Sequence, residues 1–267
     1  MTGPGYWVHL HLEGERLGGG FLLTRRFVLT AAHCLPGLAV DDRVGIECAD
    51  GQRAQGFVRQ QDKEADLALV EVTARHRVTL PMPRADVART GERWHGPYRP
   101  ADDDARLSGV ITADGRHRCT GGASIEALQL TTDQHLGDYS GYSGGPVEGV
   151  PDDPGAAPAV LGILMEQTPD RADGSRAANV LVAATLGEAM RRFDHLDVGH
   201  LIDVLRPPSL QERPAPPARF SGTEALLRQL DDWGERQVID PAQVARLKLM
   251  AVERLIDRET GGGEGTA

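Results

Sequence analysis

The sequence predicts an all-β fold for residues 1–195, followed by a short helical segment. Residues 6–12 alternate apolar and polar side chains at period two, as a half-buried strand does. The 267 residues include 32 glycines and 17 prolines but few aromatics, a composition that favours many short elements joined by turns. After the proline-rich stretch 206–219, the apolar residues change to helical spacing.

The first group of strands is expected to end near residue 76. Turns are indicated at Glu13-Gly14, Arg25-Arg26 and Asp50-Gly51, where polar residues and glycines interrupt the apolar runs. The strands between and after these turns are expected at residues 6–12, 18–23, 27–30, 44–48, 54–59 and 67–72.

A second group of strands is expected from about residue 92. The preceding stretch, 78–91, contains Pro81 and Pro83, which disfavour a central strand, so it is interpreted as a connection. The acidic residues 102–104 are expected in a solvated loop. Strands are expected at 106–111, 124–130, 160–165 and 179–184, with a short helix at 186–193.

The C-terminal part divides by composition into a proline-rich linker at 196–220, a helical hairpin at 221–260 and a loose tail at 261–267. Ser221 and Glu224 have the spacing of a capping box, and Asp240-Pro241 is typical of a second helix start. The hairpin either packs back on the preceding domain or binds a regulatory protein partner. The residues that would carry a partner contact are Leu226, Leu230, Trp233, Leu247 and Leu255.

The segment Gly141-Tyr142-Ser143-Gly144-Gly145-Pro146 suits a nucleophilic serine. Glycines tolerate the unusual dihedral angles of such a turn, and their missing side chains leave room for backbone amides to reach an oxyanion. A serine nucleophile needs a base, and the upstream sequence offers a histidine in Thr30-Ala31-Ala32-His33-Cys34 and an aspartate in Asp66-Leu67-Ala68-Leu69.

These three segments, in the order histidine, aspartate, serine, resemble the trypsin/chymotrypsin-like serine peptidases; other serine hydrolase folds carry the same residues in other orders. The resemblance covers roughly residues 6–195. It implies a double Greek-key fold of two antiparallel β-barrels, with barrel one at about 6–76 and barrel two at about 92–195. Asp62 competes with Asp66 for the aspartate role, and Asp66 is favoured because it directly precedes an apolar strand.

The resemblance implies that Ser143 attacks a peptide carbonyl while His33 transfers the proton and Asp66 orients the histidine. The amides of Gly141 and Ser143 would form the oxyanion hole. No cofactor is expected. Relatives that are activated by propeptide cleavage have an aspartate directly before the serine, and Tyr142 stands there instead. Activation by propeptide removal is therefore not expected.

The resemblance also points to a substrate-binding pocket. Gly137, six residues before Ser143, would lie at its base, and the neighbouring Asp138 either faces inward to attract a basic side chain or remains a solvated loop carboxylate. The opposite wall would contain Met165, Glu166 and Gln167, and Glu166 also suggests basic substrates. Many relatives have at Met165 a serine that bonds the aspartate.

The resemblance implies a protein or peptide substrate, and the charge and leader patterns argue against other classes of partner. The net charge of −10 argues against a nucleic acid or an anionic membrane as partner. The N-terminus has no signal-like apolar run, and no stretch approaches the roughly 18 apolar residues of a membrane span. We therefore expect a cytoplasmic protein.

The three cysteines, Cys34, Cys48 and Cys119, agree with a reducing compartment. In secreted relatives the cysteine beside the histidine is bridged to an earlier one, and Gly18 holds that position here. Buried free thiols are expected, although a pairing among the three remains open. His9 and His11 share a strand face and suggest either a metal site or an exposed face; without a third ligand in view, no metal is expected.

Two functions remain open. The favoured one is an intracellular serine endopeptidase, which a partner would recruit or trigger as in bacterial conflict and signalling systems. The alternative is a pseudo-peptidase, weak or inactive, that serves as a protein-binding module. The presence of all three residue types, His33, Asp66 and Ser143, favours the enzyme.

Overall fold

A computed structural model of the chain describes residues 5–73, 83–151 and 156–193, together with residues 227, 230, 231, 240 and 243–251. The chain divides into two units, Met1–Phe193 and Asp194–Ala267. The predicted partner residues Leu226, Trp233 and Leu255 lie outside the described residues.

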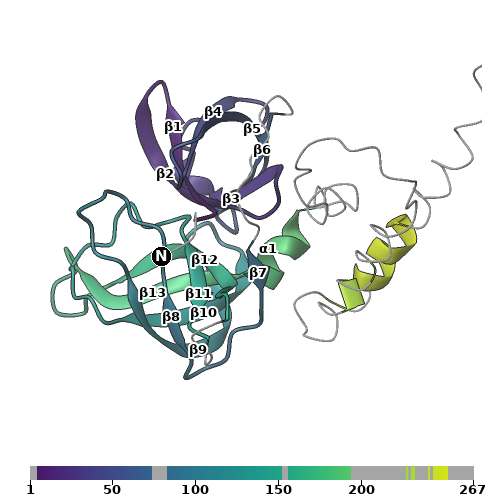
Figure 1. Cartoon of the computed structure of the whole chain (residues 1–267). Coiled ribbons are helices and arrows are strands. Elements are labelled where there is room, and N and C mark those ends of the chain that lie inside the picture. Colours follow the sequence, from purple (N-terminus) through teal and green to yellow (C-terminus); the bar gives the residue numbers. More distant parts are fainter. Residues whose placement is uncertain are drawn as a thin grey trace, which may run out of the picture. The chain divides into compact units, whose positions relative to one another are not determined.

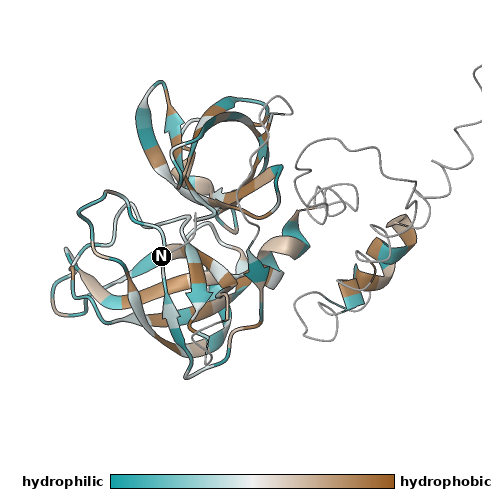
Figure 2. Cartoon of the chain, viewed as in Figure 1, coloured by the Kyte–Doolittle hydropathy of each residue, from teal (hydrophilic) through white to brown (hydrophobic). Residues whose placement is uncertain are grey.

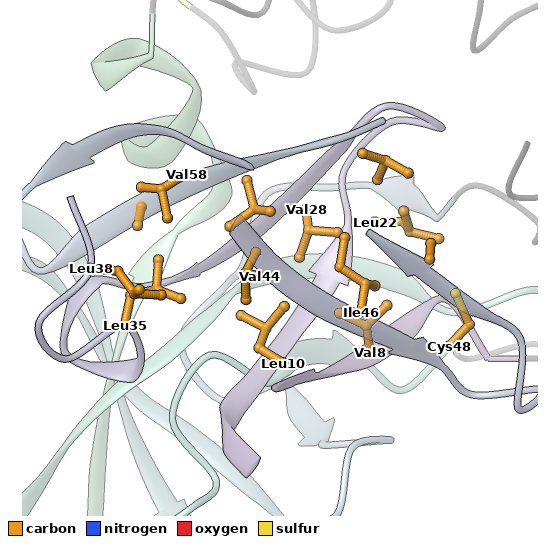
Figure 3. Close-up of a cluster of buried hydrophobic side chains, with 14 residues drawn as sticks. Val8, Leu10, Leu22, Val28, Leu35, Leu38, Val44, Ile46, Cys48 and Val58 are labelled. Carbon is orange, nitrogen blue, oxygen red and sulfur yellow. The ribbon is translucent and has the colours of Figure 1, made fainter. Parts of the chain in front are cut away.

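Six antiparallel strands close the first barrel in the order β1-β2-β3-β6-β5-β4, and Figure 1 looks nearly along its axis. Alternate side chains of each strand point inward, so the period-two pattern of the sequence becomes a filled interior (Figure 3). Val8, Leu10 and Val28 are completely buried there. The strands are β1 (Trp7–Leu12), β2 (Glu15–Leu22), β3 (Phe27–Ala31), β4 (Arg43–Cys48), β5 (Arg53–Asp62) and β6 (Leu67–Val72).

The second barrel closes in the order β11-β8-β9-β10-β13-β12, because β11 also pairs with β12. Its interior is built around Trp94, Leu130 and Val147, each fully buried, and in Figure 2 brown apolar stretches alternate with polar ones along its strands. The strands are β8 (Arg93–His95), β9 (Ser108–Arg118), β10 (Ser124–Thr132), β11 (Pro146–Gly149), β12 (Ala159–Pro169) and β13 (Ala177–Thr185). The predicted double-barrel fold is thus confirmed.

Besides β8, which precedes the first strand expected in the second barrel, two more strands were not expected from the sequence. Strand β7 (Arg84–Ala85) lies in the predicted connection and pairs in parallel with β12. Strand β11 begins at Pro146, directly after the serine loop, and spans four residues. Neither is long enough to display an alternating pattern, so only the tertiary fold defines them.

The helix α1 (Leu186–Arg192) follows β13 and is capped by Thr185, whose hydroxyl accepts from the Glu188 amide at 3.1 Å. Its Arg192 reaches Asp62 of the first barrel, with 2.6 Å between Nη1 and Oδ2. The same guanidinium bonds the largely buried Glu188. The end of the second barrel is therefore tied electrostatically to β5 of the first.

The two barrels meet where the backbones of β2 and the serine loop approach each other. The Gly19 amide donates to the Ser143 carbonyl at 3.3 Å, and Thr30 Oγ1 donates to the Gly19 carbonyl at 2.7 Å. Gly144 has φ of +83°, and a Cβ there would lie 2.1 Å from the Gly19 carbonyl oxygen. Tyr98 covers the other side of Gly19. Only glycines permit this approach.

In the second unit, residues 243–251 are helical. Val244 and Ala251 are buried, as is the predicted partner residue Leu230. Leu247 is half-buried, whereas Leu249 is 60% exposed. Leu230 therefore contributes to the interior of this unit, and Leu249 is its exposed apolar residue among those described. No helix in the described ranges has the length and apolarity needed to cross a membrane.

We expect Gly144→Ala to lower the free energy of unfolding by about 2–4 kcal/mol, because it adds left-handed backbone strain to a steric clash with Gly19. Gly174→Ala is the matched control, since a Cβ at Gly174 would meet nothing within 4 Å. Urea denaturation of the two variants measures the difference. Equal midpoints would show that the barrels separate easily at this joint.

Candidate active site

His33 and Asp66 come together at the end of the β3–β6 pair. Strand β3 runs into the 3₁₀ turn Ala32–Cys34, and Ala31 pairs with Leu67, the first residue of β6. Asp66 Oδ2 lies 2.6 Å from His33 Nδ1, and Oδ1 accepts the His33 backbone amide at 2.8 Å. Both carboxylate oxygens thus hold the histidine, which fixes the position and tautomer of its ring.

Asp66 has φ of +55°, a left-handed conformation that is unfavourable for a residue with a side chain. Such a conformation costs about 1–3 kcal/mol and persists only where neighbouring interactions compensate. Here the compensation comes from the two bonds to His33 and from the Asp66 carbonyl, which accepts the Ala32 amide at 3.0 Å. The competing residue Asp62 is bonded to Arg192 and to the Ala65 amide instead.

The hydrogen bond from Asp66 raises the pKa of His33 to about 10, with a second contribution from Cys34. A carboxylate beside an imidazole stabilises the protonated ring, which is the direction observed. The neutral ring, the form that accepts a proton from a serine, is consequently favoured by alkaline pH.

Ser143 lies in the same cleft as His33, although its hydroxyl is bonded elsewhere. Ser143 Oγ donates to the Met165 carbonyl of β12 at 3.1 Å. The Met165 side chain is buried, and its backbone carbonyl accepts the hydrogen bond of the Ser143 hydroxyl. The cleft encloses about 520 Å³ and includes His33, Ser143 and Met165 among its lining residues.

The backbone before Ser143 forms a turn with two inward amides. Gly141 has φ of +89°, and within the described part of the chain no acceptor is bonded to the amide of Gly141 or of Ser143. Tyr142 points into the second barrel, where its hydroxyl donates to the Ala105 carbonyl at 2.6 Å. Two free amides beside a serine hydroxyl are the arrangement that stabilises an oxyanion.

The predicted pocket residues fall into two groups. Met165, Glu166 and Gln167 line the cleft, whereas Gly137 and Asp138 do not. The Asp138 carboxylate is exposed and accepts from the Ser140 amide and hydroxyl at 2.9 and 2.6 Å. Of the two alternatives for Asp138, the structure favours the solvated loop carboxylate.

Several contacts of the cleft were not foreseen. Glu166 bonds the Thr120 amide at 3.0 Å and lies 3.3 Å from Nε2 of His117. Gln167 Oε1 accepts the Tyr139 amide at 2.7 Å. These partners are separated by 28 to 49 residues along the chain, so no local sequence pattern identifies them.

All three cysteines are free and buried, as expected. Burial raises the pKa of Cys48 and of Cys119 to about 11, which keeps both thiols protonated. The Cys34 sulfur lies against Gly18, since a Cβ at Gly18 would be 2.6 Å from Sγ. The Cys34 side chain therefore fills the space that a side chain at position 18 would need.

His9 and His11 are partly buried, and the His9 ring lies against Trp7 and Tyr98. Desolvation lowers the pKa of His9 to about 4, so its ring is neutral at physiological pH. In the portion of the chain that the structure describes, no three His, Cys, Asp or Glu residues form a metal-binding group.

We expect the His33 ring to remain largely protonated at pH 8, and Asp66→Asn to lower its pKa toward the 6.5 of a free imidazole, because the stabilising carboxylate is lost. Titration of the imidazole resonances by NMR measures both, with His33→Ala used to assign the signal. A pKa that is equal in both proteins would contradict the role of Asp66.

Comparisons with known proteins identify the family and the fold of the chain. The HtrA-type protease AlgW with a decapeptide superimposes with a TM-score of 0.55 at 17% identity, covering 71% of this chain and 63% of AlgW, so the chain spans less than two thirds of that relative. The inactive form of the Rv3671c protease gives 0.51 at 20% identity, covering 74% and 88%. A search of curated proteins finds no match. The Trypsin family model matches residues 2–147, more than half of the chain and the stretch that contains His33, Asp66 and Ser143. The chain belongs to the trypsin family.

Proposed function

We propose that the protein is a serine endopeptidase that cleaves peptide bonds through an acyl-enzyme. The observation that carries this proposal is the pair of hydrogen bonds between Asp66 and His33, in the cleft that also contains Ser143. Asp66 orients the imidazole, His33 takes the proton of Ser143, and the serine oxygen attacks the substrate carbonyl. His33 then gives the proton to the leaving amine.

The free amides of Gly141 and Ser143 support the second part of the mechanism. When Ser143 attacks, the carbonyl oxygen of the substrate becomes negatively charged, and two amide donors at a distance of about 3 Å stabilise that charge. Tyr142 leaves these amides free because its side chain is held inside the barrel by Ala105. Tyr142 stands in this turn where relatives that are activated by propeptide cleavage have an aspartate. This difference supports a peptidase that needs no propeptide removal.

The nucleophile must change partner before it reacts. Ser143 Oγ is bonded to the Met165 carbonyl, whereas attack requires a hydrogen bond to Nε2 of His33. Met165 lies on β12, whose edge faces the cleft, so a substrate amide that donates to this carbonyl would release the serine. Substrate binding would thus prepare the nucleophile.

The hydrogen bond from Ser143 Oγ to the Met165 carbonyl favours a second candidate function, a pseudo-peptidase that binds proteins without cleaving them. In that protein Ser143 would stay on Met165, and the cleft would serve recognition alone. The two functions differ in one measurable property, which is the reactivity of Ser143.

We further propose a cytoplasmic setting, supported by the three free buried thiols, which suit a reducing compartment. The second unit would dock a regulatory protein that recruits or triggers the peptidase, as in a bacterial conflict or signalling system. The exposed Leu249 supports such a contact. Truncation after Phe193 tests it: unchanged peptidase activity and unchanged bound proteins would eliminate the docking role.

We expect a fluorophosphonate probe to add once to the full-length protein and not to Ser143→Ala, because only an activated serine reacts. Ser140→Ala is the matched control, since Ser140 lines the same cleft three residues away and should leave the adduct unchanged. Intact-mass spectrometry measures the adduct. A protein that does not react even above pH 10, where the His33 ring is neutral, would support the pseudo-peptidase instead.

A further inference from the structure

Asp62, the aspartate that competes with Asp66 in the sequence, anchors the turn that carries Asp66. It is the last residue of β5, and residues 63–66 join β5 to β6, so Asp66 closes the turn that Asp62 opens. Asp62 Oδ1 accepts the Ala65 amide at 3.0 Å, which ties the start of the turn to the residue directly before Asp66. The shape of this turn therefore decides where the Asp66 carboxylate meets His33.

Arg192, the last residue of α1, holds the other oxygen of the Asp62 carboxylate. Its Nη1 lies 2.6 Å from Asp62 Oδ2, and its Nε donates to Glu188 Oε1 at 2.7 Å. The Arg192 and Asp62 side chains are only 22% and 26% exposed, so solvent screens their contact only in part. Burial disfavours the guanidinium charge, but the hydrogen bonds to Asp62 and Glu188 outweigh it and raise the pKa of Arg192.

The same guanidinium contacts a third element beside the turn. Nη2 of Arg192 donates to the carbonyl of Ser124, the first residue of β10, at 3.4 Å. We propose that Arg192 is a positioning residue that acts through Asp62 on the turn carrying Asp66. It thereby sets the hydrogen bond between this aspartate and His33. The inference rests on the proposed peptidase function, in which that hydrogen bond orients the general base.

The turn needs an anchor because Asp66 has a left-handed φ of +55°. Such a conformation persists only where the surrounding structure imposes it. Lys63 and Glu64 of the turn are exposed, so their side chains add little packing. Without Arg192, the Asp62 carboxylate is free to turn toward water and to release the Ala65 amide. Asp66 then relaxes toward an ordinary φ, which weakens its hydrogen bond to His33.

Titration of the His33 imidazole by NMR tests the inference in the full-length protein without requiring turnover. We expect Arg192→Lys to lower the pKa of His33 from about 10 by about one unit, a tenfold change in the protonation equilibrium. A lysine keeps the charge, but its ammonium lacks the planar fork that holds Asp62 and Glu188 together. The shift is partial because the Ala123 amide still holds the Glu64 carbonyl.

Arg192→Met separates positioning from charge by the sign of the shift. Removal of a positive charge by itself raises the pKa of an imidazole, whereas a weaker bond from Asp66 lowers it. We expect the pKa of His33 to fall in this variant as well. If Arg192 acts through Asp62, Arg192→Lys should cause no further lowering in the Asp62→Asn background, since effects that share one route are not additive.

Arg191→Lys is the matched control. Arg191 is the neighbouring arginine of α1 and also bonds Glu188, but its other partner is Glu126 of β10 in the second barrel. This variant should leave the pKa of His33 unchanged. An unchanged or raised pKa in Arg192→Lys, an equal lowering in Arg191→Lys, or an additive effect in Asp62→Asn would overturn the inference.

Two features of the design keep its outcomes distinct. If Arg192→Met does not fold, the charge-conserving Arg192→Lys decides the inference. Fluorophosphonate labelling of Ser143 decides the proposed function separately. An unreactive serine would refute catalysis, while the pKa of His33 would still decide whether Arg192 positions Asp66.

Discussion

The backbone contact between Gly19 and Gly144 governs the site, because it joins the barrel that carries His33 and Asp66 to the loop that carries Ser143. Within the first barrel, the β3–β6 pair brings histidine and aspartate together. The Gly19–Gly144 contact places the serine loop against this barrel, together with the other contacts between the two barrels. Side chains larger than hydrogen would hold the two backbones apart, so the glycines on both sides are a requirement of the chemistry.

The chain order of His33, Asp66 and Ser143 allowed the fold and the central site to be predicted from sequence, because each residue lies in a short motif beside a recognisable strand. The side-chain contacts of the cleft wall formed by Met165, Glu166 and Gln167 could not be predicted in the same way. Gln167 bonds the Tyr139 amide, which joins residues 28 positions apart. Side-chain direction at such a contact follows from tertiary packing, which single-sequence periodicity does not encode.

Two features of the site oppose proton transfer from Ser143 to His33. The carboxylate of Asp66 favours protonated His33, and a protonated ring cannot accept the hydrogen of Ser143. The Ser143 hydroxyl accordingly donates to the backbone carbonyl of Met165. Before His33 could accept the serine hydrogen, the Ser143 hydroxyl would have to leave the Met165 carbonyl, and the ring would have to lose its proton.

Met165 replaces a serine that in many relatives bonds the aspartate, yet Asp66 is not left without support. The turn that precedes it is held by the tip of the β9–β10 hairpin, where the Ala123 amide donates to the Glu64 carbonyl at 3.1 Å and Cys119 packs against Ala65. The same tip is bonded to Glu166 of β12 through Thr120. Strand β12, which lines the cleft, is thus connected through the tip of the β9–β10 hairpin to the turn that carries Asp66. These contacts stand in place of a single serine hydroxyl. This support holds the turn that carries Asp66 and leaves both carboxylate oxygens to His33.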